Sequence, residues 1–261
     1  KRGWIEPSEN FDVLEQRVLN FYKLNNVEQD VRFYHAARRN YVENLSAVQL
    51  AWLFRVRQLA SALDVPRYTK RSLLSAVGDL ELLMEEPEEI RRVPGILAEA
   101  GIRFVIVEPF PESKIEGVCF WLNNNKSPVI GLSLRYGRID NFWFNLRHEI
   151  EHVLNQDGKA QVIVDDSDIL AGADDQRAEE RIANEAAKEF CVPSLKMDDF
   201  IARLDPMYST GNFTGFSALM KRHPGIVAGQ LQRITGRWAL FTKFQVDIRK
   251  MGQEALNRKK N

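Results

Sequence analysis

The spacing of apolar residues changes at Gly101, and this change limits the folds that the chain can adopt. Residues 8–100 carry apolar side chains three and four positions apart, which is typical of amphipathic helices. Ser8 is the expected N-cap of the first helix. Further helices are predicted over residues 45–63, 71–84 and 87–100. The sequence therefore predicts a helical N-terminal region of residues 1–100.

Short β-rich runs replace the helical spacing after Gly101. Three of them, divided by Pro-rich and Asn-rich turn sequences, lie at residues 103–107, 117–122 and 128–134. Consecutive strands of this kind indicate an antiparallel meander. A helix over 140–155, a fourth strand over 161–164, a helix over 174–191 and shorter helices follow. The predicted fold class is α+β, with a small antiparallel sheet and a helix packed on it in a second domain of residues 101–261.

The composition of the chain says more about its possible partners than about its fold. Of 261 residues, 44% are hydrophobic, which is enough for a real core. Lys plus Arg and Asp plus Glu number 36 each, so no net charge attracts the chain to nucleic acid or to an anionic membrane. No apolar run approaches the roughly 20 residues of a membrane span, and we expect a cytoplasmic protein without membrane contact. Because the chain begins with Lys1, we expect a segment to precede it. Cys119 and Cys191, in apolar surroundings, are expected to be buried free thiols.

Residues 147–155, with the sequence RHEIEHVLN, hold two of the four histidines of the chain. His148 and His152 lie one helical turn apart, where their nitrogens can converge on a single ion. Glu149 occupies the general-base position of this HExxH arrangement. The apolar stripe of the helix lies on a different side and comprises Phe142, Leu146, Ile150, Val153 and Leu154. A chance match on a helix surface is the alternative, but the scarcity of histidine elsewhere favours a zinc site.

A zinc site of the open type needs a third protein ligand. The next predicted helix offers two adjacent carboxylates, Glu179 and Glu180. Glu180 is favoured because Asn184, one turn further on, can accept the outer N–H of a ligand histidine. Glu179 has no polar partner at that spacing and is the competing ligand. The buried stripe of this helix is expected to comprise Ala183, Ala186, Ala187 and Phe190.

Together these segments resemble the ImmA/IrrE family of metallopeptidases. The similarity is to the group that follows an N-terminal Xre-type helix-turn-helix domain and is often called HigA-like antitoxins. It extends over most of the chain, at residues 2–5, 117–122, 130–136, 140–155, 180–193 and 223–232. Glu180 and Asn184 match the family's ExxAN pattern, with Pro193 nine residues on. The chain departs from the family at Glu151, where glycine is common, and at Ala186, where phenylalanine is common.

The resemblance implies a zincin-like fold and a zinc-dependent endopeptidase. His148, His152 and Glu180 would hold the zinc ion, and Glu149 would be the catalytic base. An Xre-type repressor is the implied protein substrate, and a homodimer is compatible with this reading. Nucleic acid would be bound only through a helix-turn-helix domain outside this chain. We expect the 128–134 run to bind an extended substrate at the edge of the sheet. Candidates to stabilise the oxyanion are Arg135, Tyr136 and His223.

Two other functions stay open at this point. The chain is also interpretable as a regulatory or antitoxin module without turnover, in which the metallopeptidase-like domain binds a partner or senses zinc. DNA binding by the chain itself is the third hypothesis, because residues 59–66 weakly resemble the start of a helix-turn-helix. Asp64 stands where the glycine of that turn is usual, which argues against it.

Overall fold

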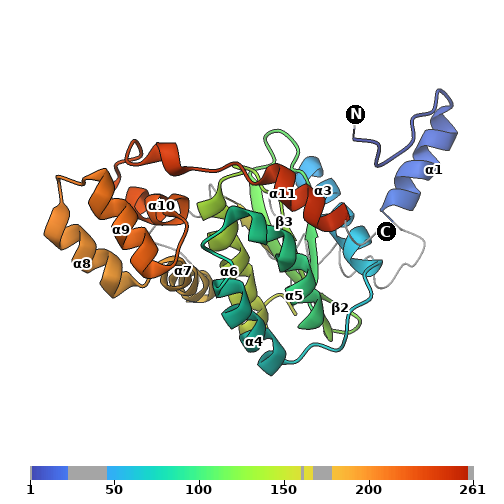
Figure 1. The fold of residues 1–261 in the computed structure, drawn as a ribbon. Helices are drawn as coiled ribbons and strands as arrows, with labels where there is room; N and C mark the ends of the chain where they lie inside the picture. Colours follow the sequence, from blue (N-terminus) through green and yellow to red (C-terminus); the bar gives the residue numbers. More distant parts are fainter. Residues whose placement is uncertain (1, 23–45, 160–161, 167–177, 258–261) are drawn as a thin grey trace.

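The computed structural model describes residues 2–22, 46–159, 162–166 and 178–257, and shows an α+β fold (Figure 1). Its α-helices are α1 (Phe11–Phe21), α3 (Ala47–Ser61), α4 (Lys70–Glu81), α5 (Val93–Glu99), α6 (Ile139–Asn155), α7 (Ala178–Cys191), α8 (Ser194–Leu204), α9 (Thr210–Met220), α10 (Pro224–Thr235) and α11 (Arg249–Asn257). Two 3₁₀-helices cover Pro87–Arg92 and Thr242–Phe244. The predicted helices are thus present, with ends displaced by a few residues within the described ranges; residue 45 and residues 174–177 of the predictions lie outside those ranges. No helix of these described ranges is long and apolar enough to cross a membrane.

The sheet is mixed, and the predicted antiparallel meander is wrong. Its four strands are β1 (Arg103–Ile106), β2 (Ile115–Leu122), β3 (Ser127–Leu132) and β4 (Ile163–Asp166). They lie in the order β1-β3-β2-β4, with β1 parallel to β3 and the other pairs antiparallel. The connection from β1 to β2 is long enough to carry the chain past β3, so neighbouring strands in sequence need not pair. Because β3 pairs on both sides, the expected substrate-binding edge at 128–134 is also wrong.

Both faces of the sheet are covered by helices (Figure 1). Helix α3 packs on one face, where Trp52 and Val56 contact alternate strand residues such as Val118 and Val129. The Trp52 indole N–H also donates to the Val107 carbonyl oxygen at 2.9 Å. Helices α4, α5 and α6 contribute to the core on the other face. Helices that precede residue 100 in the sequence cover the sheet that follows it. Among the described residues, each of these two hydrophobic clusters therefore contains residues from both sides of residue 100.

Local capping explains where the early helices begin. Ser46 and Gln49 form a reciprocal capping box at the start of α3. Asn10, and not the expected Ser8, is the N-cap of α1, and its side chain accepts from the backbone N–H groups of two following residues. Residues 62–69 separate α3 from α4 without helix, whereas a helix-turn-helix uses a turn of about 3–4 residues. The DNA-binding hypothesis for residues 59–66 is therefore not supported.

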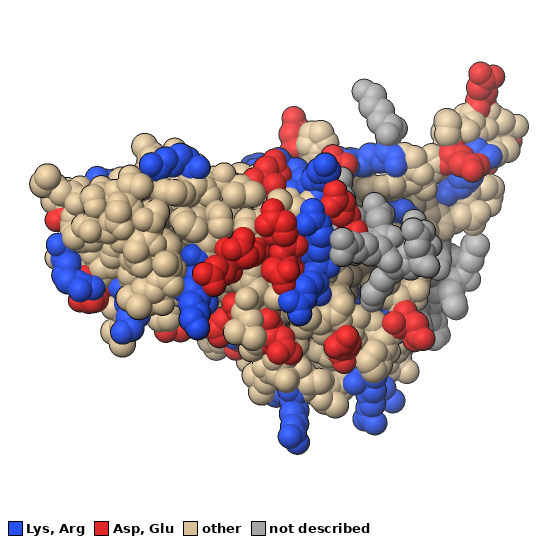
Figure 2. All heavy atoms as spheres, in the orientation of Figure 1, with Lys and Arg blue, Asp and Glu red and all other residues tan. Residues whose placement is uncertain are grey.

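The C-terminal helices α8, α9 and α10 enclose a core of their own beside α7. Arg222 joins this group to the rest of the molecule. Its guanidinium donates to the carbonyl oxygens of Phe190 and Cys191 at 3.1 and 3.0 Å, and forms an ion pair with Glu81 at 2.5 Å. The face in Figure 2 shows acidic and basic side chains side by side over its middle, whereas the surface over α8 and α9 consists largely of other residues. This face has no single-sign field of the kind that attracts nucleic acid.

Candidate metal centre

Helix α6 supplies three of the predicted site residues and buries all of them. The expected apolar stripe is confirmed, because its five members are buried against the sheet and the neighbouring helices. His148 and His152 are 2% and 0% exposed, and Glu149 is 0% exposed. The helix ends at Gln156, whose left-handed backbone (φ 64°) turns the chain away. His148, Glu149 and His152 are therefore as deeply buried as the apolar stripe of α6.

Helix α7 brings the third carboxylate to α6. Ala183 and Ala187 are completely buried, and their small side chains let the two helices pack closely. Glu180 lies on the side that faces the histidines and is buried, whereas Glu179 is exposed. Of the two adjacent glutamates, the structure therefore brings Glu180 and not Glu179 to the pair of imidazoles.

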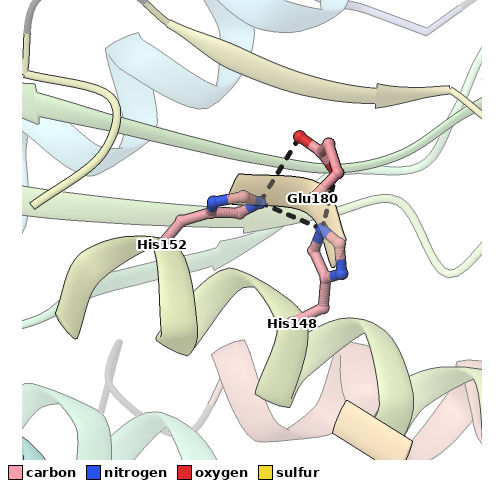
Figure 3. A group of neighbouring side chains, drawn as sticks. All are labelled: His148, His152 and Glu180. Carbon is pink, nitrogen blue, oxygen red and sulfur yellow. Dashed lines mark hydrogen bonds and ion pairs between the residues drawn. The ribbon is translucent and has the colours of Figure 1, made fainter. Parts of the chain in front are cut away.

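The side chains of His148, His152 and Glu180 point toward one another (Figure 3). The two histidine Nε2 atoms lie 3.0 Å apart. One Glu180 carboxylate oxygen lies 3.3 Å from His148 Nε2, and the other lies 3.7 Å from His152 Nε2. Zinc–ligand bonds of about 2.0–2.1 Å at tetrahedral angles place donor atoms roughly 3.3 Å apart. The donor set and its spacing therefore fit zinc.

The outer nitrogens of both imidazoles also have partners. His148 Nδ1 lies 3.1 Å from Asn184 Oδ1, the contact predicted for Asn184. His152 Nδ1 lies 3.1 Å from a carboxylate oxygen of Asp157. Acceptors at both outer nitrogens favour the tautomer in which Nδ1 carries the proton and Nε2 is free to bind a metal ion. In that tautomer, two nitrogen lone pairs and a carboxylate oxygen face one point, an arrangement that a bound cation would stabilise.

Asp157 is a site residue that the sequence analysis missed. It follows the left-handed Gln156, and its backbone N–H donates to the His152 carbonyl oxygen at 2.8 Å. The Trp121 indole N–H donates to the Asp157 carbonyl oxygen at 2.7 Å. These two bonds hold the loop so that the Asp157 carboxylate returns to His152. An acidic residue just beyond the end of an HExxH helix was the available signal.

Glu149 lies against the sheet at Gly117. A Cβ atom at Gly117 would lie 1.9 Å from Glu149 Oε1, so only glycine leaves room for this carboxylate. The pairing of β2 with β4 shifts register between Ile115 and Gly117. At this irregularity the carboxylate of the adjacent Glu116 also turns toward α6, and it accepts from the Asn145 side chain at 2.9 Å. β-bulges commonly redirect side chains in this way.

The three oxyanion candidates have other contacts in the structure. The Arg135 guanidinium donates to the Lys114 carbonyl oxygen at 3.2 Å and lies 5.0 Å from the ring centre of Tyr136. His223 is the N-cap of α10, where its Nδ1 accepts from the Gly225 backbone N–H. Burial lowers the pKa of His223, with Glu86 and Glu88 acting in the opposite direction. His223 thus acts as a helix cap.

The unusual Glu151 forms an ion pair with Arg147 at 2.7 Å, one turn away on α6. This contact gives the extra carboxylate a partner on its own helix. Cys119 and Cys191 are buried free thiols, as expected, and burial raises the pKa of Cys191 to about 12. Neither thiol belongs to the donor set.

Comparison with known proteins adds no assignment. A scan against protein-family models and searches of curated proteins and of solved structures gave no match. The chemistry of the centre is therefore argued from its own residues.

Proposed function

We propose that this chain is a zinc-dependent endopeptidase that cleaves a regulatory protein. The observation that carries the proposal is the convergence of His148, His152 and Glu180 on one point, with both imidazoles oriented by their outer partners. Three protein ligands, with a fourth position left for water or substrate, are typical of catalytic zinc sites. The sequence resemblance to ImmA/IrrE metallopeptidases, with their zincin-like fold, supports the same reading.

Glu149 is the proposed general base. When bound, zinc supplies a Lewis acid that polarises the scissile carbonyl group and activates water. Glu149 takes a proton from the attacking water as the new C–O bond forms. When the C–N bond breaks, Glu149 delivers this proton to the leaving amine. The Gly117 backbone lies against the Glu149 carboxylate, and burial of Glu149 keeps this carboxylate away from bulk water.

An extended substrate would pair with β4. This strand pairs only with β2 in the described part of the sheet, so it is an edge strand there. Asp165 of β4 lies opposite Gly117, the residue that contacts Glu149. Addition of a strand at such an edge uses backbone hydrogen bonds and accepts many sequences. The resemblance points to an Xre-type repressor as the protein that supplies this segment.

Metal content tests the ligand set. His148→Ala, His152→Ala and Glu180→Ala should lose zinc, measured by elemental analysis and by competition with a chelator at one pH. Glu179→Ala is the matched control, because Glu179 is exposed one position away on α7. Its zinc affinity should stay normal. Weak zinc binding in Glu179→Ala beside normal binding in Glu180→Ala would overturn the assignment.

Cleavage tests the catalytic role. The zinc-loaded chain should cleave peptides in a mixed-sequence library and an Xre-type repressor, detected by mass spectrometry. Glu149→Gln should keep zinc and lose cleavage, since it removes the base and no ligand. If the zinc-loaded chain bound the repressor without cleaving it, the endopeptidase proposal would fail in favour of the regulatory or antitoxin module.

A further inference from the structure

One face of β2 contacts the C-terminal half of α6 and the loop after it. Gly117, Cys119 and Trp121 alternate along the strand, so they share this face. Gly117 contacts the proposed base Glu149, and the other two residues belong to the same hydrophobic cluster as the apolar stripe of α6. A single strand therefore faces both the proposed base and the end of the helix that carries His152.

Two contacts hold the loop after α6 against β2. The Trp121 indole N–H donates to the Asp157 carbonyl oxygen at 2.7 Å. Gly158, with a left-handed backbone (φ 74°), lies so close to the strand that a Cβ atom would be 2.8 Å from the Cys119 carbonyl oxygen. The three atoms nearest to this Cβ all belong to the backbone of β2, so they cannot give way as a flexible side chain could. Glycine at this position therefore lets the loop reach the strand.

The Trp121 side chain is itself held in place. It is 9% exposed, and the Tyr68 ring packs edge-on against it with ring centres 5.4 Å apart. The Lys159 ammonium group lies 4.6 Å from the centre of the Trp121 ring. The indole N–H is therefore a fixed point of attachment for the loop.

The loop in turn contacts His152. Asp157 Oδ2 lies 3.1 Å from His152 Nδ1, and an acceptor there favours the tautomer that leaves Nε2 to bind a metal ion. We propose that Trp121 and Gly158 are positioning residues for zinc. They hold the Asp157 carboxylate at His152 Nδ1, and they thereby set the tautomer of His152 and the zinc affinity. This role requires the zinc site of the proposed function but not peptide cleavage.

Trp121→Phe tests the indole donor, because phenylalanine keeps an aromatic ring and has no N–H. Chelator competition should show zinc binding about threefold to tenfold weaker. The matched control is Trp52→Phe, which loses the same kind of bond, to the Val107 carbonyl oxygen, on the other face of the sheet. It should lower the free energy of unfolding and leave the zinc affinity unchanged. In the Asp157→Ala chain, Trp121→Phe should change the zinc affinity by less than about twofold, since it acts through Asp157.

Gly158→Ala displaces the same loop and serves if Trp121→Phe folds poorly. Gly236→Ala is its matched control, because that backbone is also left-handed (φ 68°) but a Cβ there meets nothing within 4 Å. Both variants carry the backbone strain of alanine at a positive φ, and only Gly158→Ala adds the clash with β2. Zinc should bind about tenfold more weakly to Gly158→Ala than to Gly236→Ala.

Nitrogen-15 NMR of histidine in the metal-free chain distinguishes this role from a general loss of packing. At a pH where histidine is neutral, both loop variants should raise the fraction of His152 that carries its proton on Nε2, and both controls should leave it unchanged. An unchanged fraction in both loop variants would overturn the proposal, whatever their zinc affinities. Additive effects of Trp121→Phe and Asp157→Ala on the zinc affinity would also overturn it. A chain that shows the expected shifts but cleaves no peptide would confirm the positioning role and refute the endopeptidase function.

Discussion

Replacement of Gly117 by alanine tests how the sheet positions the proposed base. The added Cβ would lie 1.9, 2.9 and 3.1 Å from Oε1, Cδ and Cγ of Glu149, whereas ordinary contacts begin at 3.4 Å. All three of its closest atoms belong to Glu149, so the Glu149 carboxylate must move, whereas His148, His152 and Glu180 can stay in place. Overpacking of this kind costs about 1–3 kcal/mol of unfolding free energy. Misplacement of a catalytic group by 1 Å costs about 100-fold in rate.

The matched control is Gly78→Ala, because a Cβ there meets nothing within 4 Å and Gly78 lies inside α4. This variant should gain about 0.5–1 kcal/mol, since alanine is the better helix former. Urea denaturation measures both free energies, chelator competition measures zinc affinity, and kcat/KM measures cleavage. Gly117→Ala should lose stability and turnover and keep zinc. A Gly117→Ala protein as stable as the unaltered chain would refute the packing argument, whatever its activity.

Three further predictions concern other parts of the structure. Asp157→Ala should weaken zinc binding about 10–100-fold, because His152 loses the acceptor that orients its ring. Competition with a chelator measures the zinc affinity, and Asp79→Ala is the control. Burial lowers the pKa of His223, so the unfolded chain binds the proton more tightly than the folded chain. The free energy of unfolding should therefore fall as the pH drops through about 6.5. The variant His223→Asn should reduce this pH dependence, as measured by urea denaturation at several pH values. Arg222→Met should lower the free energy of unfolding by about 3 kcal/mol, because the carbonyl oxygens of Phe190 and Cys191 lose their donor. A change below about 0.5 kcal/mol would contradict the role of Arg222 in joining the C-terminal helices to the rest of the molecule.

The helices and the grouping of His148, His152 and Glu180 were predictable because both depend on local spacing. The i, i+4 pair of His148 and His152 needs only one helix, and the choice of Glu180 over Glu179 needed only the partner Asn184 at i+4. Helix ends were less certain, since Ser8 and Asn10 are both good caps and packing decides between them.

Strand order was not predictable, because it depends on contacts between distant residues. The sequence pattern of β1, β2 and β3 is the same whether β2 or β3 lies beside β1, since both faces of the sheet are buried. The contact of Gly117 with Glu149 was not predictable for the same reason, because it joins an irregularity in β2 to a helix residue 32 positions away in sequence. The position of the Asp157 side chain depends on the left-handed backbone of Gln156, which the sequence does not indicate strongly.

The placement of β3 between β1 and β2 has a consequence for folding from a ribosome. Helix α3 emerges before any strand, and its buried side chains share one cluster with residues of β1, β2 and β3, so this cluster is complete only when β3 has followed. The β2–β3 hairpin is local and can form first, whereas β1 must wait for β3 before it gains a neighbour. Until about 70 further residues have been synthesised, part of the apolar side of α3 stays exposed to water or to chaperones. Slow translation over residues 62–126 should therefore lengthen the period in which the nascent chain is prone to aggregation.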